Sequence, residues 1–171
     1  MTADGTDRVD LGLDSSGRRI LLTRRMLAAF DAACALAGLT PVIVQGAFMA
    51  ELGGAAAASD GYHDLAGCLD TRTWDLTAEQ QDRVLRAGRS VGWAVWRRDE
   101  EHGGMEEHHH WVLLDEPGCH PGAAGQQQAY LDGLDGLDAA GPDYHWRPES
   151  IPVFPQDGGT GDGQGAGAGS T

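Results

Sequence analysis

The chain has 171 residues and a formal net charge of −14, and all twelve of its basic residues are arginine. This length suits one domain, and an acidic chain without a basic stripe argues against nucleic acid or an anionic membrane surface as a partner. No run approaches the roughly 18–20 apolar residues of a membrane span, and the N-terminus lacks a secretory signal pattern. We therefore expect a protein without a signal peptide that is cytoplasmic as synthesised.

The predicted elements alternate between strands and helices along the chain. Apolar residues at helical spacing over 24–37, after the N-cap residue Thr23, predict the first helix. Thr77 and Gln80 form a capping-box pattern that predicts the second helix, and residues 121–131 form the third. Strands are predicted at 17–22, 41–44, 66–71, 91–97 and 108–114, with a loop over 47–62. This order predicts an α+β fold with a small, mainly antiparallel sheet and helices packed on one side.

The two ends of the chain differ in composition from its middle. Residues 1–16 are polar and rich in Gly and Asp, and residues 156–171 contain no large apolar side chain. Such segments bury too little apolar surface to offset the entropy cost of ordering them. We predict a flexible N-terminus (1–16), one folded domain (17–155) and a disordered Gly-rich tail (156–171).

Two short clusters contain four of the seven histidines, and they predict a metal site. If residues 108–114 form a strand, His108 and His110 share one face of the sheet and His109 points the other way. His63 precedes the strand that contains Asp70, and a turn there can bring it back over that carboxylate. Two imidazoles and a carboxylate, with a fourth position left open, are the ligand set of a catalytic zinc ion.

A zinc site of this kind also needs a general base. A carboxylate that lies near the metal without binding it can take the proton of the attacking water, and Glu107, three residues before His110, is the candidate. Spacing alone leaves a second interpretation open. Adjacent histidines can be incidental surface residues, and His63 or Asp70 can serve in ordinary hydrogen bonds and salt bridges.

The pattern S-x(3)-H-x(6)-D from Ser59 to Asp70, followed by E-x-x-H and H-x-H ending at His110, resembles one group of zinc peptidases. These are the D-alanyl-D-alanine carboxypeptidases and L-alanyl-D-glutamate endopeptidases, related in fold to the Hedgehog signalling domain. The chain looks most like compact members from actinobacteria and their phages, over residues 18–147. The resemblance implies a Hedgehog-like fold and one Zn²⁺ per chain, held by His63, Asp70 and His110.

The resemblance also implies roles for the neighbouring residues. His108 maps to a histidine beside the metal that can stabilise the oxyanion, and Glu107 maps to the acidic base. Because both residues are present, the base is either Glu107 or His108. Gln45 and Ser59 map to substrate-binding positions. The implied activity is hydrolysis of peptidoglycan stem or cross-link peptides by a metal-activated water, in a monomeric enzyme such as a phage endolysin. The alternative is a non-catalytic zinc-binding module of the same fold, associated with a cell wall or a phage particle.

Two residues depart from the family pattern. Ala66 stands where the family often has Gly, and Cys68 replaces a small Ala. Because Cys68 should share a face with Asp70, two interpretations remain. It is either a small buried residue, or a thiolate that competes for zinc and blocks the water position.

Overall fold

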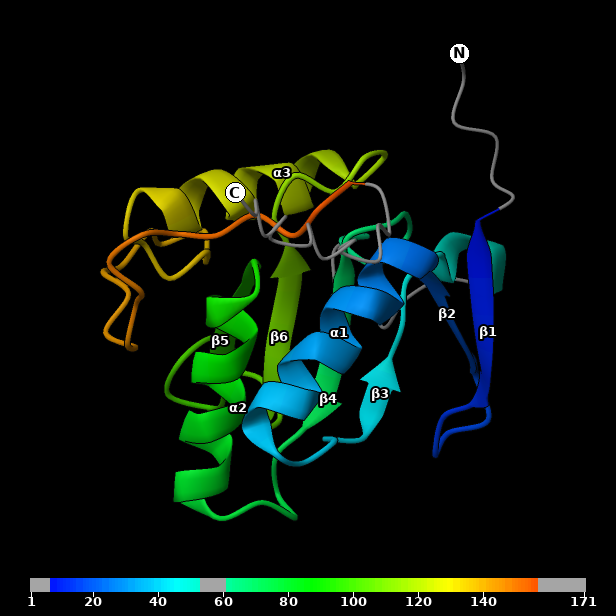
Figure 1. The fold of residues 1–171 in the computed structure, drawn as a ribbon, viewed down its shortest axis with the longest axis horizontal. Coiled ribbons are helices and arrows are strands. Elements are labelled where there is room, and N and C mark those ends of the chain that lie inside the picture. Colours follow the sequence, from blue (N-terminus) through cyan, green and yellow to red (C-terminus); the bar gives the residue numbers. More distant parts are fainter. Residues whose placement is uncertain (1–6, 53–60, 157–171) are drawn as a thin grey trace, which may run out of the picture.

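Two antiparallel sheets and three α-helices make up the described part of the chain, residues 7–52 and 61–156 of a computed structural model (Figure 1). The α+β prediction is therefore confirmed. The first sheet pairs β1 (Arg8–Leu13) with β2 (Arg19–Thr23), and the second has the order β3 (Ile43–Gln45), β4 (Cys68–Arg72), β6 (His108–Leu113), β5 (Trp93–Arg98). The helices are α1 (Arg24–Ala37), the short 3₁₀ helix η1 (Met49–Leu52), α2 (Ala78–Ser90) and α3 (Pro121–Leu131).

Local sequence signals explain where the helices begin and end. The hydroxyl of Thr23 accepts a hydrogen bond from the Met26 backbone N–H at 3.0 Å, which caps the start of α1. That helix ends at Gly38, whose φ of 67° is accessible to glycine at little cost. At the start of α2, Thr77 and Gln80 make both hydrogen bonds of the predicted capping box.

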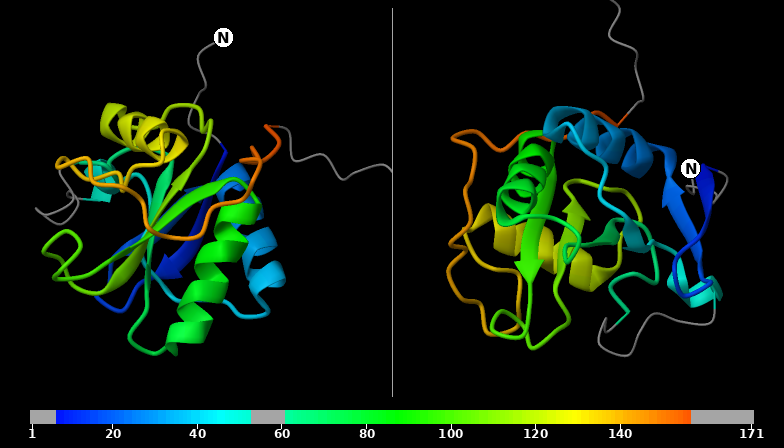
Figure 2. Two further views of the ribbon diagram at one scale, coloured as in Figure 1. Left: turned by 90° about the vertical axis from the view of Figure 1, so that its left-hand side faces the viewer. Right: turned by 90° about the horizontal axis from the view of Figure 1, so that it is seen from below.

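The helices lie on both faces of the four-stranded sheet, so the prediction that they pack on one side was wrong. Helices α1 and α2 bury their apolar residues against one face, together with Trp93 and Trp111. Helix α3 lies on the opposite face (Figure 2), where its buried residues Ala123 and Tyr130 belong to one apolar cluster with Trp96. Within the two described ranges, no helix is both long and apolar enough to cross a membrane.

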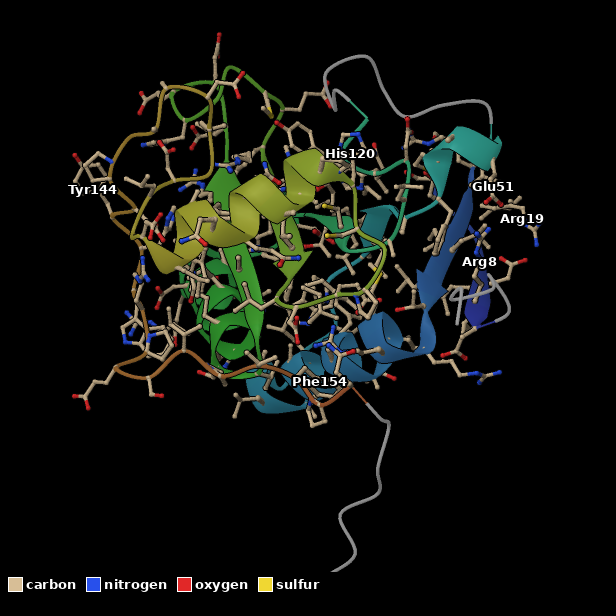
Figure 3. The ribbon with its side chains drawn as sticks, turned by 90° about the horizontal axis from the view of Figure 1, so that it is seen from above. Arg8, Arg19, Glu51, His120, Tyr144 and Phe154 are labelled. Carbon is tan, nitrogen blue, oxygen red and sulfur yellow. The ribbon has the colours of Figure 1, made fainter. Side chains whose placement is uncertain are left out.

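The N-terminal region contains a strand where we predicted a flexible segment, and this part of the prediction was wrong. Strand β1 pairs with β2 through a turn in which Asp14 accepts hydrogen bonds from the backbone of Ser16 and Arg18, both at 2.8 Å. Arg8 of β1 forms an ion pair with Glu51 of η1, and the two side chains lie side by side in Figure 3. The predicted Gly-rich tail lies outside the described residues apart from Gln156.

One row of residues runs across the four-stranded sheet on the face that α3 covers. Gln45 pairs with Asp70, Asp70 pairs with His110, and His110 pairs with Trp96. Residues that pair directly across antiparallel strands place their side chains on the same face. This register brings two of the predicted metal ligands together.

Candidate metal centre

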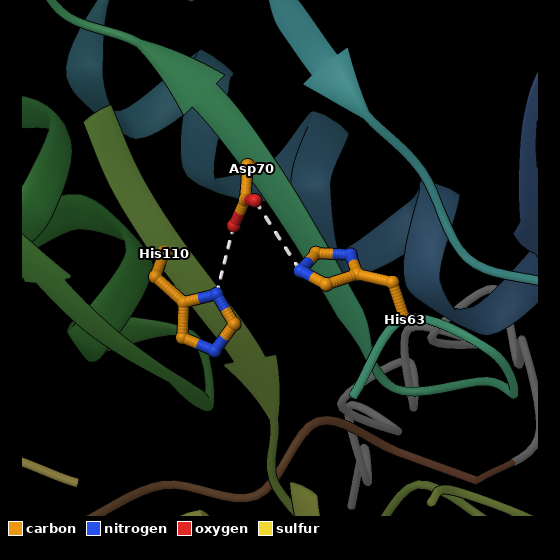
Figure 4. Close-up of side chains that lie close together, drawn as sticks. All are labelled: His63, Asp70 and His110. Atoms are coloured by element: carbon orange, nitrogen blue, oxygen red, sulfur yellow. Dashed lines mark hydrogen bonds and ion pairs between the residues drawn. The ribbon is translucent and has the colours of Figure 1, made fainter. Parts of the chain in front are cut away.

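His63, Asp70 and His110 lie together, as predicted, with one donor atom from each inside a group no wider than 4.8 Å (Figure 4). Asp70 Oδ1 is 2.7 Å from Nδ1 of His110, and Asp70 Oδ2 is 3.3 Å from Nε2 of His63. The three residues are only 1–9% exposed. Burial of three polar side chains requires that each finds a partner, and here each has at least one partner within the group.

His63 reaches Asp70 from the turn before β4. The backbone of this turn is fixed by a hydrogen bond from Met49 N–H to the His63 carbonyl oxygen at 2.9 Å. The imidazole Nδ1 lies 3.0 Å from the carbonyl oxygen of Gly46. Because a carbonyl oxygen only accepts, Nδ1 carries a proton, and Nε2 is the ring nitrogen that faces Asp70.

His110 is held in the complementary tautomer by α3. Its Nε2 lies 3.0 Å from Oε1 of Gln126. The amide nitrogen of Gln126 donates to the carbonyl oxygen of Gly136 at 3.2 Å, so the amide oxygen is the atom that faces the imidazole. Nε2 of His110 therefore donates to Gln126, and Nδ1 is the ring nitrogen that faces Asp70, where it could bind a metal ion.

One nitrogen of each imidazole and the carboxylate of Asp70 thus point toward one place. Three acceptors around one centre repel one another unless a proton or a metal cation lies between them. Ligating histidines commonly donate their second ring N–H to a carbonyl or carboxylate oxygen, as His63 and His110 do to Gly46 and Gln126. The residues present therefore fit a bound metal ion.

The pKa shifts in the group follow from the same arrangement. Burial alone would raise the pKa of Asp70, but the positive charge of His63 and the hydrogen bond from His110 hold it well below its usual range. Burial opposes a charged His63, yet the charge of Asp70 and its hydrogen bond raise the pKa of His63. Burial lowers the pKa of His110, since Asp70 does not fully compensate and His63 repels a second charge. The group is therefore built around an anionic carboxylate and one positive charge.

The predicted substrate-binding and oxyanion residues lie at different places. Gln45 is buried and is the cross-strand partner of Asp70, so it borders the group. His108 lies on β6 two residues before His110, on the same face by strand alternation, and its Nδ1 is 2.6 Å from the Glu106 carbonyl oxygen. Ser59 lies outside the described residues.

Glu107 is not brought to the metal group. Its carboxylate accepts a hydrogen bond from Gln81 of α2 at 3.1 Å and forms an ion pair with Arg97 at 3.3 Å. Strand alternation explains this position, because the register that places His110 on the α3 face places odd-numbered neighbours on the α2 face. In this arrangement the Glu107 carboxylate contacts Gln81 and Arg97, and no contact with His63, Asp70 or His110 is found among the described residues.

Cys68 lies on the α3 face but is not a member of the donor group. It is fully buried and packs in an apolar cluster with Ala94, Trp96 and Val112. Burial, together with the nearby charge of Asp70, raises its thiol pKa well above the usual value, which disfavours a thiolate. The structure therefore favours the interpretation of Cys68 as a small buried residue.

Three contributors to the site were not predicted from the sequence. These are the Gly46 carbonyl, the Gln126 amide and the ring of Trp96, which stacks on His110 with centroids 6.3 Å apart. A backbone carbonyl leaves no signal in a sequence. Gln126 stood only among three consecutive glutamines of a predicted helix, and its role depends on how that helix packs.

Comparisons with known proteins add no assignment, since no protein-family model, curated protein or solved structure matches this chain.

Proposed function

We propose that this protein is a zinc-dependent peptidase that hydrolyses peptidoglycan stem or cross-link peptides, with His63, Asp70 and His110 as the ligands of Zn²⁺. One observation carries the metal assignment: a nitrogen of each imidazole and an oxygen of the buried Asp70 carboxylate lie within 4.8 Å of one another, while the other ring nitrogens contact Gly46 and Gln126. The substrate class rests on the resemblance of the two sequence motifs to peptidoglycan peptidases.

The donor set favours zinc over the hard cations. Magnesium and calcium prefer oxygen ligands, whereas two imidazole nitrogens and one carboxylate oxygen match zinc. Among the described residues, no fourth His, Cys, Asp or Glu joins the group. Three protein ligands leave a coordination position for water or substrate, which is typical of catalytic rather than structural zinc.

Zinc bound at these residues supplies a Lewis acid that polarises a substrate carbonyl and lowers the pKa of water. The protein contributes the placement of the surrounding groups. Gln45 is the cross-strand neighbour of Asp70, and in this proposal its amide helps to orient a peptide carbonyl. His108 lies on the same face of β6 as His110, two residues before it, and in this proposal it exchanges a proton with the substrate. The base is thus His108 rather than Glu107 in this proposal.

A second candidate is a zinc-stabilised module without turnover. It is favoured by the low exposure of the three ligands and by the position of Glu107, which leaves the group without a second carboxylate among the described residues. In this alternative the metal stabilises the fold and performs no chemistry.

Incubation of zinc-loaded protein with purified peptidoglycan separates these candidates. New amino termini should appear with wild type and with Glu107→Ala, and they should fall at least tenfold with His108→Ala. Full activity of His108→Ala, combined with loss in Glu107→Ala, would reverse the assignment of the base. One bound zinc per chain without amine release, on peptidoglycans of several compositions, would favour the structural module.

A further inference from the structure

Gln126 connects the metal group to the segment that follows α3. Its side chain is half-buried, its amide oxygen faces Nε2 of His110 at 3.0 Å, and its amide nitrogen donates to the Gly136 carbonyl oxygen at 3.2 Å. Both ends of the amide are therefore used. This double anchoring prevents the amide from rotating and offering its nitrogen to the imidazole.

The segment that anchors Gln126 also contacts the ring beneath His110. Gly136 has a φ of 69°, and a Cβ at this position would lie 3.0 Å from two atoms of the Trp96 ring. Trp96 stacks on His110 with an interplanar angle of 16°. Arg98 fixes the same segment by donating from Nη2 to the Asp135 carbonyl oxygen at 2.8 Å. The close packing of Gly136 on Trp96 therefore sets the position of the carbonyl that orients Gln126.

The orientation of Gln126 decides which nitrogen of His110 is available to a metal. If the amide oxygen accepts from Nε2, the lone pair lies on Nδ1, which faces Asp70 at 2.7 Å. Loss of this acceptor frees the ring to protonate at Nδ1 and donate to Asp70, and that tautomer cannot bind the metal from Nδ1. Hydrogen-bond partners of metal-binding histidines typically contribute about 10–100-fold in metal affinity.

We propose that Gln126 is a positioning residue that holds His110 in the metal-binding tautomer, and that the Gly136 segment fixes Gln126 in turn. The inference rests on the proposed metal site but not on peptidase activity. Through Gln126, helix α3 would contribute to zinc affinity, although it lies outside both of the histidine-containing sequence clusters.

The test measures zinc affinity of the full chain by competition with a chromophoric chelator. Gln126→Leu should bind zinc about 10–100-fold more weakly than wild type. Gln126→Glu should stay within about threefold of wild type, because a carboxylate oxygen also accepts from Nε2 of His110. Gln128→Leu is the matched control, since Gln128 is exposed on the same helix and contacts Asp132 instead.

Long-range ¹H–¹⁵N spectra of the histidine rings give a readout that a merely structural role would not change. In zinc-loaded wild type the Nε2–H of His110 should be hydrogen-bonded to Gln126 and slow to exchange with solvent, and in zinc-loaded Gln126→Leu it should exchange faster. Equal zinc affinities for Gln126→Leu and Gln128→Leu would overturn the inference, as would a His110 Nε2–H that exchanges equally fast in zinc-loaded wild type and Gln126→Leu. A wild-type protein that binds no zinc would instead overturn the proposed metal site itself, and the inference with it.

Discussion

Asp70 and His110 lie directly opposite each other on β4 and β6, with 2.7 Å between Oδ1 and Nδ1. Two of the three proposed ligands are therefore fixed by sheet register and not by loop geometry. Sites built on strands are held more precisely than sites on loops, because the backbone ladder fixes both side chains at once. His63 completes the group from a turn that the Gly46 carbonyl and Met49 N–H hold in place.

Cys68 lies two residues before Asp70 on the same face, and its substitution tests whether it belongs to the metal site. Cys68→Ala should keep one zinc per chain and lower the free energy of unfolding by about 1 kcal/mol, because it leaves a small cavity. Cys34→Ala, at another buried cysteine on α1, is the matched control. Metal analysis and urea unfolding measure both effects. Loss of zinc from Cys68→Ala alone would show that the thiol is a ligand.

Two helical glycines respond oppositely to an added methyl group. A Cβ on Gly88 of α2 would lie 2.6 Å from atoms of both Trp111 and Val95, so Gly88→Ala should destabilise the protein by about 1–3 kcal/mol through overpacking. A Cβ on Gly125 of α3 meets no atom within 4 Å, so Gly125→Ala should stabilise it by about 0.5–1 kcal/mol. Urea unfolding measures both values. Equal effects would contradict the packing of α2 on the sheet.

Asp143 predicts a pH dependence of stability. Its side chain is fully buried, with Arg89 Nη2 at 2.8 Å and His145 Nδ1 at 2.9 Å. Burial alone would raise its pKa, but the His145 hydrogen bond and the Arg89 charge lower it. Because the folded pKa lies below the unfolded value, the unfolded chain binds the proton first as the pH falls. Asp143 therefore contributes its full stabilisation above its unfolded pKa of about 3.9. This stabilisation is lost as the pH falls from that value through the folded pKa.

Substitution of Asp143 should reveal this loss. Asp143→Asn should cost about 3 kcal/mol in unfolding free energy at pH 6, because it leaves the buried charge of Arg89 unpaired, and clearly less at pH 3. Asp82→Asn, which removes an exposed pair with Arg86, should change little at either pH. Urea unfolding at the two pH values is the measurement. A cost for Asp143→Asn that does not shrink at pH 3 would contradict the pKa assignment.

Local signals predicted most of the helices and strands. The Thr23 cap, the Thr77–Gln80 capping box and the Gly38 terminus all lie where the sequence pattern placed them. Strand β1 was missed because residues 1–16 as a whole are polar and rich in Gly and Asp, although Val9, Leu11 and Leu13 alternate with other residues and the segment pairs with β2. The position of α3 was missed for a related reason. Its apolar residues do not gather on one side of the helix, so only tertiary packing decides which face of the sheet it covers.

The metal site was predictable only in part. Strand alternation correctly joined Asp70 and His110, and the same rule applied one residue further places Glu107 on the opposite face, where it contacts Gln81. Motif spacing alone had suggested Glu107 as the base. The orienting contacts of Gly46 and Gln126 depend on tertiary packing and a backbone carbonyl, which no residue pattern encodes.

The central claim is that His63, Asp70 and His110 bind one zinc ion, and the zinc content of the purified full-length chain tests it most directly. Wild type and Asp75→Ala, which loses only an exposed carboxylate paired with Arg72, should each hold one zinc per chain after dialysis against a weak chelator. Asp70→Ala should hold none, because it removes the one anionic ligand between the two imidazoles. A wild-type chain without zinc, or an Asp70→Ala chain that retains zinc at full affinity, would contradict the account.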